Sequence, residues 1–223
     1  MSTQDFAERL AAPTPTPGGG AAAARVGLYA CSLLRMVAGI TLRKLGEPAP
    51  GAGASPVATS LSAIESEAQA LGEQFSELEK EDSAAFEAYL AACRLPRGTQ
   101  AEKDHRLAAR RKALLGATEV PIEMLEASLC VLEVAARLLD LRTEAPIRAE
   151  SDLFAAVELA GAAFRVAAWN IRVNVDLLPA EAAAEVKDRW STLESEFSAR
   201  SASLAARITD RGQQGPGSAS GST

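Results

Sequence analysis

The chain has 223 residues, of which 48% are hydrophobic but only 4% aromatic, so a core would be built mainly from Ala, Leu and Val. Ala and Leu favour helices, and β-branched runs typical of strands are sparse. The formal net charge of −6 excludes general nucleic-acid binding, which requires a basic face. We expect one helical domain over residues 1–209 and a Gly/Ser tail over 210–223 with a composition typical of disorder.

The cysteines Cys31, Cys93 and Cys130 lie far apart and have neither metal-site nor disulfide-framework spacing, so we expect them to be packed in the core. An odd number of cysteines, without the charge and apolar pattern of a signal peptide, predicts a cytoplasmic protein. The apolar stretch after Val26 is broken at Arg35, well short of the ~20 residues that a membrane span needs. We therefore expect no membrane contact.

The N-terminal part of the chain contains a short amphipathic helix, predicted over residues 2–11, followed by the segment PTPTPGGG. A nearly uncharged helix is predicted next, over residues 21–45. A helix that is apolar on most faces has to be buried, and its many small residues allow close packing. Gly18 to Gly20 leave backbone N–H groups free at the positive end of this helix. That geometry suits an anion or a polar ligand, although such glycines more often serve only a turn.

Apolar residues at every third or fourth position predict a long helix over residues 57–95, after a Pro/Gly-rich loop. Thr99 and Glu102 match a capping box and predict the start of the next helix. Pro121 should kink or break that helix near Glu119, because proline lacks the backbone donor that a helix interior needs. The later helices are expected over residues 122–141, 153–178 and 180–208.

Two of these roughly six helices, at residues 21–45 and 153–178, are apolar almost all round. One chain of this size can hardly bury both of them completely. We therefore predict an all-α bundle of about six helices around two apolar central helices. The remaining apolar surface would be buried against a second copy of the chain in a homodimer.

Several short motifs occur together in a fixed order, and six or more in register are hard to obtain by chance. They are APTPTPGGGAAA at 12–23, MVAGIT at 36–41, EDSAAFEAYLAA at 81–92, LPRGT at 95–99, ATEVP at 117–121, SD at 151–152 and NIRVN at 170–174. In these motifs the chain resembles the cyclodeaminase/cyclohydrolase family. This family comprises the C-terminal domain of formiminotransferase-cyclodeaminase and the free-standing methenyltetrahydrofolate cyclohydrolases.

The resemblance implies an all-helical homodimer with its active site near the subunit interface and a tetrahydrofolate derivative as substrate. Two reactions are typical of the family. One hydrolyses 5,10-methenyltetrahydrofolate to 10-formyltetrahydrofolate, and the other closes 5-formiminotetrahydrofolate to the methenyl form with release of ammonia. The resemblance implies neither a metal nor a permanently bound cofactor.

The motifs also point to site residues. Asp82 and Asp152 are the acid/base candidates, although Asp82 could be an exposed helical charge and Asp152 could simply cap its helix beside Ser151. Asn170 and Asn174 share one helix face, and an unpaired buried amide costs ~1–3 kcal/mol, so both need partners. Those partners are either the pterin edge of the substrate or a neighbouring helix.

The glutamate carboxylate of a folate requires local positive charge, for which Arg172, Arg94, Arg97, Arg43 and Lys44 are candidates. His105, the sole histidine, lies in a charged stretch and is expected at the surface. The predicted substrate-binding set is Pro17, Gly18, Gly19, Gly20, Lys44, Ser151, Asn170, Arg172 and Asn174.

The sequence departs from the family at several polar positions. After MVAGIT the family carries a lysine-rich segment ending in tyrosine, whereas LRKLGEPAPG here keeps only Lys44. Gly39 and Cys93 stand where asparagine and tyrosine are common, and APIR at 145–148 replaces a GNxN pattern. Two alternatives therefore stay open. The scaffold could act on a different C–N substrate in a specialised biosynthetic pathway, or it could be a non-catalytic helical binding protein.

Overall fold

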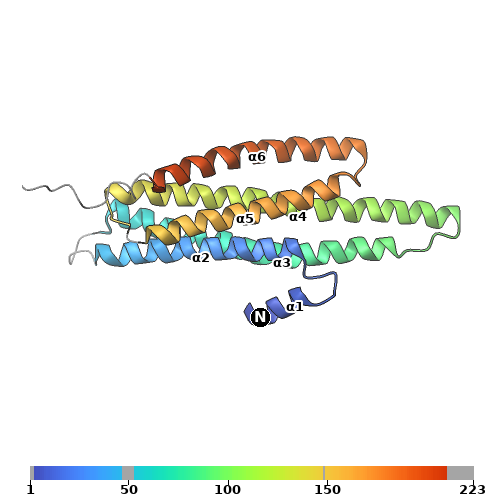
Figure 1. Ribbon diagram of the computed structural model, residues 1–223, viewed down its shortest axis with the longest axis horizontal. Coiled ribbons are helices and arrows are strands. Elements are labelled where there is room, and N and C mark those ends of the chain that lie inside the picture. The colour runs from blue at the N-terminus through green and yellow to red at the C-terminus, as the bar shows by residue number, and fades with distance from the viewer. Residues whose placement is uncertain (1–2, 47–52, 148, 210–223) are drawn as a thin grey trace, which may run out of the picture.

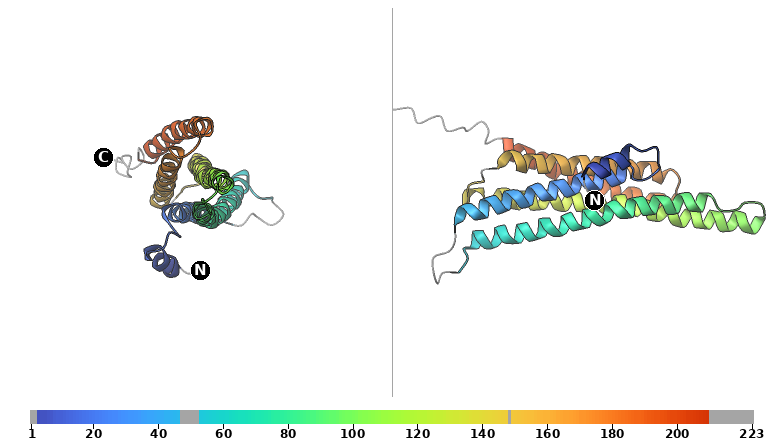
Figure 2. Two further views of the ribbon diagram at one scale, coloured as in Figure 1. Left: turned by 90° about the vertical axis from the view of Figure 1, so that its right-hand side faces the viewer. Right: turned by 90° about the horizontal axis from the view of Figure 1, so that it is seen from below.

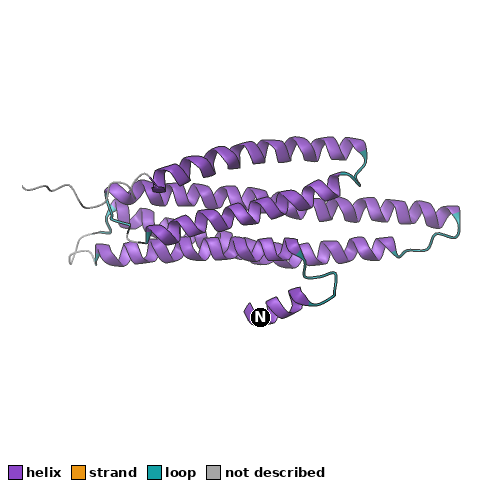
Figure 3. Cartoon of the chain, viewed as in Figure 1, coloured by secondary structure: helices purple, strands orange, loops and turns teal. Residues whose placement is uncertain are grey.

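The computed structural model describes residues 3–46, 53–147 and 149–209, and this part of the chain is all-helical, as predicted. The predicted tail at 210–223 and most of the loop after the first long helix lie outside the described residues. The elements are α1 (Thr3–Ala11), α2 (Gly19–Leu45), α3 (Pro56–Cys93), α4 (Gln100–Asp140), a 3₁₀ turn (Leu141–Thr143), α5 (Glu150–Val175) and α6 (Ala180–Thr209) (Figures 1 and 3).

Helices α2 to α5 form the body of an elongated bundle. α2 packs mainly against α3 and α5, while α4 packs against α3, α5 and α6. α1 and α6 lie on opposite sides of this body, and the connected ends of α3 and α4 project beyond the other helices (Figures 1 and 2). The core between the helices is aliphatic, with fully buried side chains that include Leu34, Phe75, Leu125, Leu132 and Ile171.

The small residues of α2 allow α3 to approach closely, as expected from the sequence. A Cβ atom added at Gly27 would lie 2.4 Å from Cε1 of Phe75, so only glycine fits beside that ring. On the facing helix, a Cβ at Gly72 would lie 3.3 Å from Cδ1 of Leu28 and 3.5 Å from Cβ of Cys31. The α2–α3 contact therefore depends on Gly27, and at Gly72 a side chain would fit only tightly.

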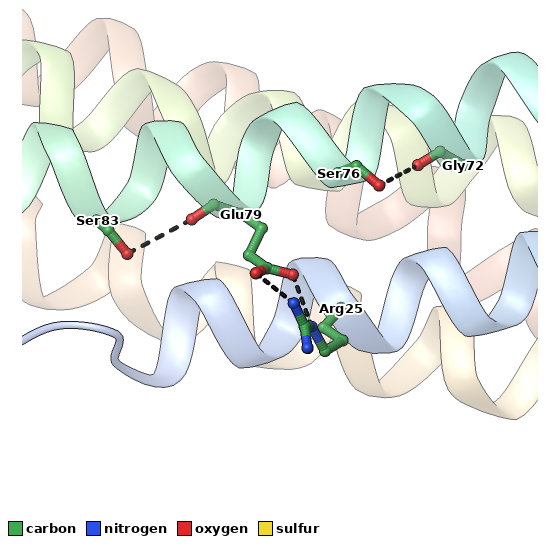
Figure 4. A network of polar contacts seen from close by, with 5 residues as sticks. All are labelled: Arg25, Gly72, Ser76, Glu79 and Ser83. Carbon is green, nitrogen blue, oxygen red and sulfur yellow. Dashed lines mark hydrogen bonds and ion pairs between the residues drawn. The ribbon is translucent and has the colours of Figure 1, made fainter. Parts of the chain in front are cut away.

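One ion pair adds to this contact and also anchors α1. Nη2 and Nε of Arg25 in α2 lie 2.6 and 2.7 Å from the two carboxylate oxygens of Glu79 in α3 (Figure 4). The guanidinium also lies over the ring of Phe6 in α1, 3.7 Å from its centroid, and Phe6 is buried. Arg25 thus links three helices.

Two predictions about helix boundaries were wrong. α4 runs without a break from Gln100 to Asp140 through Pro121, because packing on α3, α5 and α6 holds it together despite the proline. α5 begins at Glu150 with Ala149 as its N-cap residue, so Ser151 and Asp152 lie in the first turn instead of capping the helix. By contrast, the capping box of Thr99 and Glu102 is present with both of its hydrogen bonds.

By length and composition, α2 and α5 are each apolar enough to cross a membrane, so the expectation that α2 falls short of a span is corrected. Each helix contains an 18-residue window of high mean hydropathy despite its charged residues. About half of each window is buried inside the bundle, as is common for core helices of helical bundles.

Candidate functional site

A cavity of about 280 Å³ lies where α2 begins, between this end of α2 and the helices α3, α4 and α5. Glycines Gly18 to Gly20 form one wall, and side chains from the other three helices complete it. The structure therefore brings six of the predicted site residues together here. The lining consists of Pro15, Thr16, Gly18, Gly19, Gly20, Asp82, Phe86, Ala117, Asn170, Val173 and Asn174.

Asp82 of α3 points its carboxylate at the start of α2. The carboxylate accepts a hydrogen bond from the backbone N–H of Ala21. It lies so close to α2 that a Cβ atom at Gly20 would be 2.0 Å from Oδ1 of Asp82. Gly18, the N-cap residue of α2, provides no side-chain cap, so a carboxylate from another helix meets the positive end of α2.

The position of Asp82 changes its acidity. Burial raises the pKa of the Asp82 carboxyl, and the hydrogen bond from Ala21 opposes this effect without cancelling it. A carboxyl whose pKa is raised toward neutral pH exchanges protons more readily under physiological conditions than an ordinary aspartate. Asp82 is half-buried and borders the cavity, so its oxygens are within reach of a bound molecule.

Asn170 and Asn174 enter the cavity from α5, one turn apart. Nδ2 of Asn174 donates a hydrogen bond of 3.0 Å to the backbone carbonyl of Ala117 in α4. The side chain of Asn174 therefore bonds to the neighbouring helix α4 and also borders the cavity. The two roles considered for the asparagines, structural and ligand-binding, are compatible in this residue.

Other predicted site residues do not line this cavity. Pro17 is buried beside its glycine wall, and Arg172 faces the exposed ring of Trp169 with its Cζ atom 5.1 Å from the centroid. Lys44 is exposed near the far end of α2, and Ser151 is exposed in the first turn of α5.

Asp152 lies on α5, as Asn170 does, but near the opposite end of the helix. At about 1.5 Å per residue, the two are about 27 Å apart along the helix axis. Within one chain, then, the two acid/base candidates do not share a cavity. Only Asp82 lies in the one described here.

Several lining residues escaped prediction from the sequence. Phe86 and Val173 are large apolar side chains that line the cavity and are exposed. Ala117 was also not predicted to line the cavity. Pro121, four residues later in the helix, could have indicated it, because a proline there leaves the carbonyl of Ala117 without its helical donor. Thr16 contributes through its hydroxyl, which donates to Glu87 of α3 at 2.6 Å and fixes the segment before the glycines.

Within the described residues, no three His, Cys, Asp or Glu side chains come close enough together to hold a metal ion. His105 is exposed, as expected. Cys31 is buried, whereas Cys93 and Cys130 are only partly buried, so the expectation of buried packing holds fully for Cys31 alone.

The sequence profile of the Formiminotransferase-cyclodeaminase family matches residues 2–191. Methenyltetrahydrofolate cyclohydrolase from Methylorubrum extorquens strain AM1 is 31% identical over 182 residues, which cover 82% of this chain and 83% of that protein. Formimidoyltransferase-cyclodeaminase from Sus scrofa is 31% identical over 131 residues, which cover 58% of this chain and 24% of the larger pig protein.

The fold has a counterpart among solved structures. The crystal structure of formiminotetrahydrofolate cyclodeaminase from Thermotoga maritima superposes with a TM-score of 0.76 at 23% identity, covering 94% of this chain and 96% of that one. The likeness extends over the whole bundle and agrees with the match of the family profile. The chain therefore belongs to the formiminotransferase-cyclodeaminase family.

Proposed function

We propose that this chain is an enzyme of folate one-carbon metabolism that hydrolyses 5,10-methenyltetrahydrofolate to 10-formyltetrahydrofolate. The observation that carries the proposal is the Asp82 carboxyl, whose pKa is raised by burial, beside the start of α2 and in one cavity with Asn170 and Asn174. The similarity to a methenyltetrahydrofolate cyclohydrolase, which extends over most of both chains, supports the same reaction.

The reaction requires a proton acceptor that later returns the proton. The methenyl carbon lies between two nitrogens as an amidinium and is electrophilic without further activation. The carboxylate of Asp82 takes a proton from water as the water oxygen bonds to this carbon. It then returns the proton to N5 as the bond between the carbon and N5 breaks. The remaining hydroxyl proton passes to water, so the formyl group is left on N10 and the reaction releases one proton.

The other cavity residues bind the pterin. Asn170 and Asn174 supply hydrogen-bonding groups for its polar edge, and the exposed side chains of Phe86 and Val173 contact its ring. Gly18 to Gly20 keep the start of α2 open to the bound molecule. The proposal includes no metal and no permanently bound cofactor, and tetrahydrofolate enters only as the substrate.

The functional unit in this proposal is a homodimer that shares its sites. The cavity of about 280 Å³ lies just below the ~300–1,000 Å³ typical of small-molecule sites, so one chain offers only part of a folate site. The outer face of α2 and α5 carries exposed apolar side chains that a second copy would cover, among them Tyr29, Met36, Val166, Trp169 and Val173.

A twofold axis across this face would bring the other end of the partner's α2 and α5 beside the cavity. That end carries Lys44, Ser151 and Asp152, whereas Arg172 lies near the cavity end of α5. In the proposed dimer Lys44, Ser151 and Asp152 complete the site from the partner chain, and Arg172 comes from the same chain as the cavity. Lys44 and Arg172 then supply positive charge for the glutamate tail, and Asp152 supplies the second carboxylate.

A spectroscopic assay tests the reaction. Purified protein is mixed with 5,10-methenyltetrahydrofolate, and loss of the methenyl absorbance is followed beyond the uncatalysed rate. We expect turnover that Asp82→Asn lowers by about 10²–10⁴-fold, the usual contribution of a general acid/base. Release of ammonia from 5-formiminotetrahydrofolate instead would identify the cyclodeaminase reaction, and binding without either reaction would leave only a folate-binding protein.

Mixed dimers test the shared site. Asp82→Asn and Asp152→Asn proteins, each inactive alone, are unfolded together and refolded as a mixture. If Asp152 acts across the interface, each mixed dimer keeps one site with both aspartates, and activity returns. Continued inactivity of verified mixed dimers would mean that the two residues do not act in trans.

A further inference from the structure

The carbonyl group of Ala117 in α4 lacks its usual helical partner. In an α-helix this carbonyl would accept from the backbone N–H four residues later, and that residue is Pro121, which has no N–H. Ala117 is only partly buried and borders the cavity. The proline thus leaves an unused acceptor at the edge of the proposed site.

Asn174 of α5 occupies this acceptor and is oriented by it. A carbonyl accepts only from a donor, so the amide must turn its Nδ2 atom toward Ala117, at 3.0 Å. Its Oδ1 atom, which can only accept, is left for another partner. Among the described residues no donor bonds to Oδ1, and Asn174 borders the cavity.

We propose that Pro121 is a positioning residue that, by withholding its N–H, holds Asn174 with its oxygen presented to the bound molecule. The ligand therefore carries an N–H donor on that side. Asp82 provides a second acceptor in the same cavity, which the start of α2 borders with its backbone N–H groups. A heterocycle edge with amino and ring N–H groups, such as that of a pterin, matches this arrangement. The ligand class rests on the function proposed above, whereas the orientation of Asn174 does not.

Steady-state kinetics with methenyltetrahydrofolate tests the proposal with Pro121→Ala, Asn174→Ala and the double variant. In Pro121→Ala the new N–H satisfies Ala117 within the helix, Asn174 is no longer held, and KM should rise about tenfold, as for one lost hydrogen bond. The double variant should be no worse than Asn174→Ala. Multiplicative effects of the two substitutions would overturn the proposal.

Thermal unfolding separates this role from a purely structural one. An interior proline disfavours a helix, so Pro121→Ala should keep or raise Tm while substrate affinity falls. Pro56→Ala is the matched control, because Pro56 is an exposed proline at the first position of α3, where no helical carbonyl depends on it. We expect it to leave KM unchanged. A loss of affinity in proportion to a loss of Tm in Pro121→Ala would contradict positioning.

If the wild-type protein does not turn over methenyltetrahydrofolate, the proposed reaction fails, and the orientation of Asn174 is still measurable. Its side-chain amide protons, assigned by their absence in Asn174→Ala, should exchange slowly in the wild type because they bond to Ala117. In Pro121→Ala they should exchange at the rate of a solvent-exposed amide. Equal exchange in the two proteins would overturn the positioning role, whatever the reaction.

Discussion

The two apolar helices of the bundle, α2 and α5, begin in contrasting ways. Their N-cap residues, Gly18 and Ala149, both lack a capping side chain. α5 has Glu150 and Asp152 in its own first turn, whereas α2 has no acidic residue there. The carboxylate at the start of α2 is that of Asp82, which comes from α3 and packs against Gly20. The positive end of α5 therefore has acidic residues from its own first turn, whereas the positive end of α2 has a carboxylate from another helix.

This difference bears on the cavity at the start of α2. Local acidic residues such as those of α5 stay near solvent and balance the helix dipole without creating a space. The carboxylate of Asp82, which a neighbouring helix delivers, is partly buried against the start of α2 and borders the cavity there. Burial is also what raises the pKa of Asp82. The proposed chemistry therefore depends on the packing of α3 against α2.

The largest expected effect comes from closing the space between Asp82 and α2. In Gly20→Ala the new Cβ would lie 2.0 Å from Oδ1 of Asp82, so the carboxylate has to leave its position. Activity should fall by at least about 100-fold, close to the loss of the acid/base itself. The assay is turnover of methenyltetrahydrofolate, with circular dichroism to confirm folding.

Gly116→Ala is the matched control for Gly20→Ala. Gly116 is also a helical glycine, but a Cβ there meets no atom within 4 Å. This variant should keep full activity and gain up to about 1 kcal/mol from helix propensity. Normal activity in Gly20→Ala would show that the close approach of Asp82 to α2 is unimportant for the reaction.

The all-helical fold and most helix limits follow from the sequence, because apolar periodicity and the Thr99 capping box are local signals. The site follows only in part. Gly18 to Gly20 predict the start of a helix. Nothing in the sequence near Asp82 predicts that this residue, 62 positions after Gly20, will pack against that helix start. The same holds for Pro121. Its missing N–H predicted a kink or a break in the helix, but α4 is continuous, and Asn174 from a distant helix satisfies the carbonyl that the proline leaves free.

A second prediction concerns what holds α3 against α2. Glu79 precedes Asp82 by three residues on the face of α3 that meets α2, and its ion pair with Arg25 is largely buried, with side-chain exposures of 14% and 15%. Glu79→Gln leaves the guanidinium without its countercharge, so the free energy of unfolding should fall by about 3 kcal/mol. Denaturant unfolding measures this change, and activity should fall with it because Asp82 loses its support.

Lys80→Met is the control for Glu79→Gln. It removes a neighbouring ion pair on the same helix, between Lys80 and Glu77, whose side chains are 68% and 63% exposed. Such a surface pair contributes about 0–1 kcal/mol, so the variant should unfold almost as the wild type does. Equal losses in both variants would mean that burial of the Arg25 pair does not matter.

The smallest effect, and the most direct comparison of the two helix starts, is in the pH dependence of stability. Because burial raises the pKa of Asp82 above its ordinary value of 3.8, folding favours its protonated form. The contribution of Asp82 to stability is therefore most favourable below that value and is lost as the pH rises through the folded-state pKa.

The Tm of Asp82→Asn should exceed that of the wild type at neutral pH, and the difference in Tm should disappear in acid. Asp152→Asn should instead lower neutral-pH stability by about 0.3–1 kcal/mol, because it removes a local charge from the start of α5. If Asp82→Asn were the less stable protein at neutral pH, with a gap that closes in acid, the start of α2 would be stabilising the Asp82 carboxylate, and the two helix starts would be electrostatically alike.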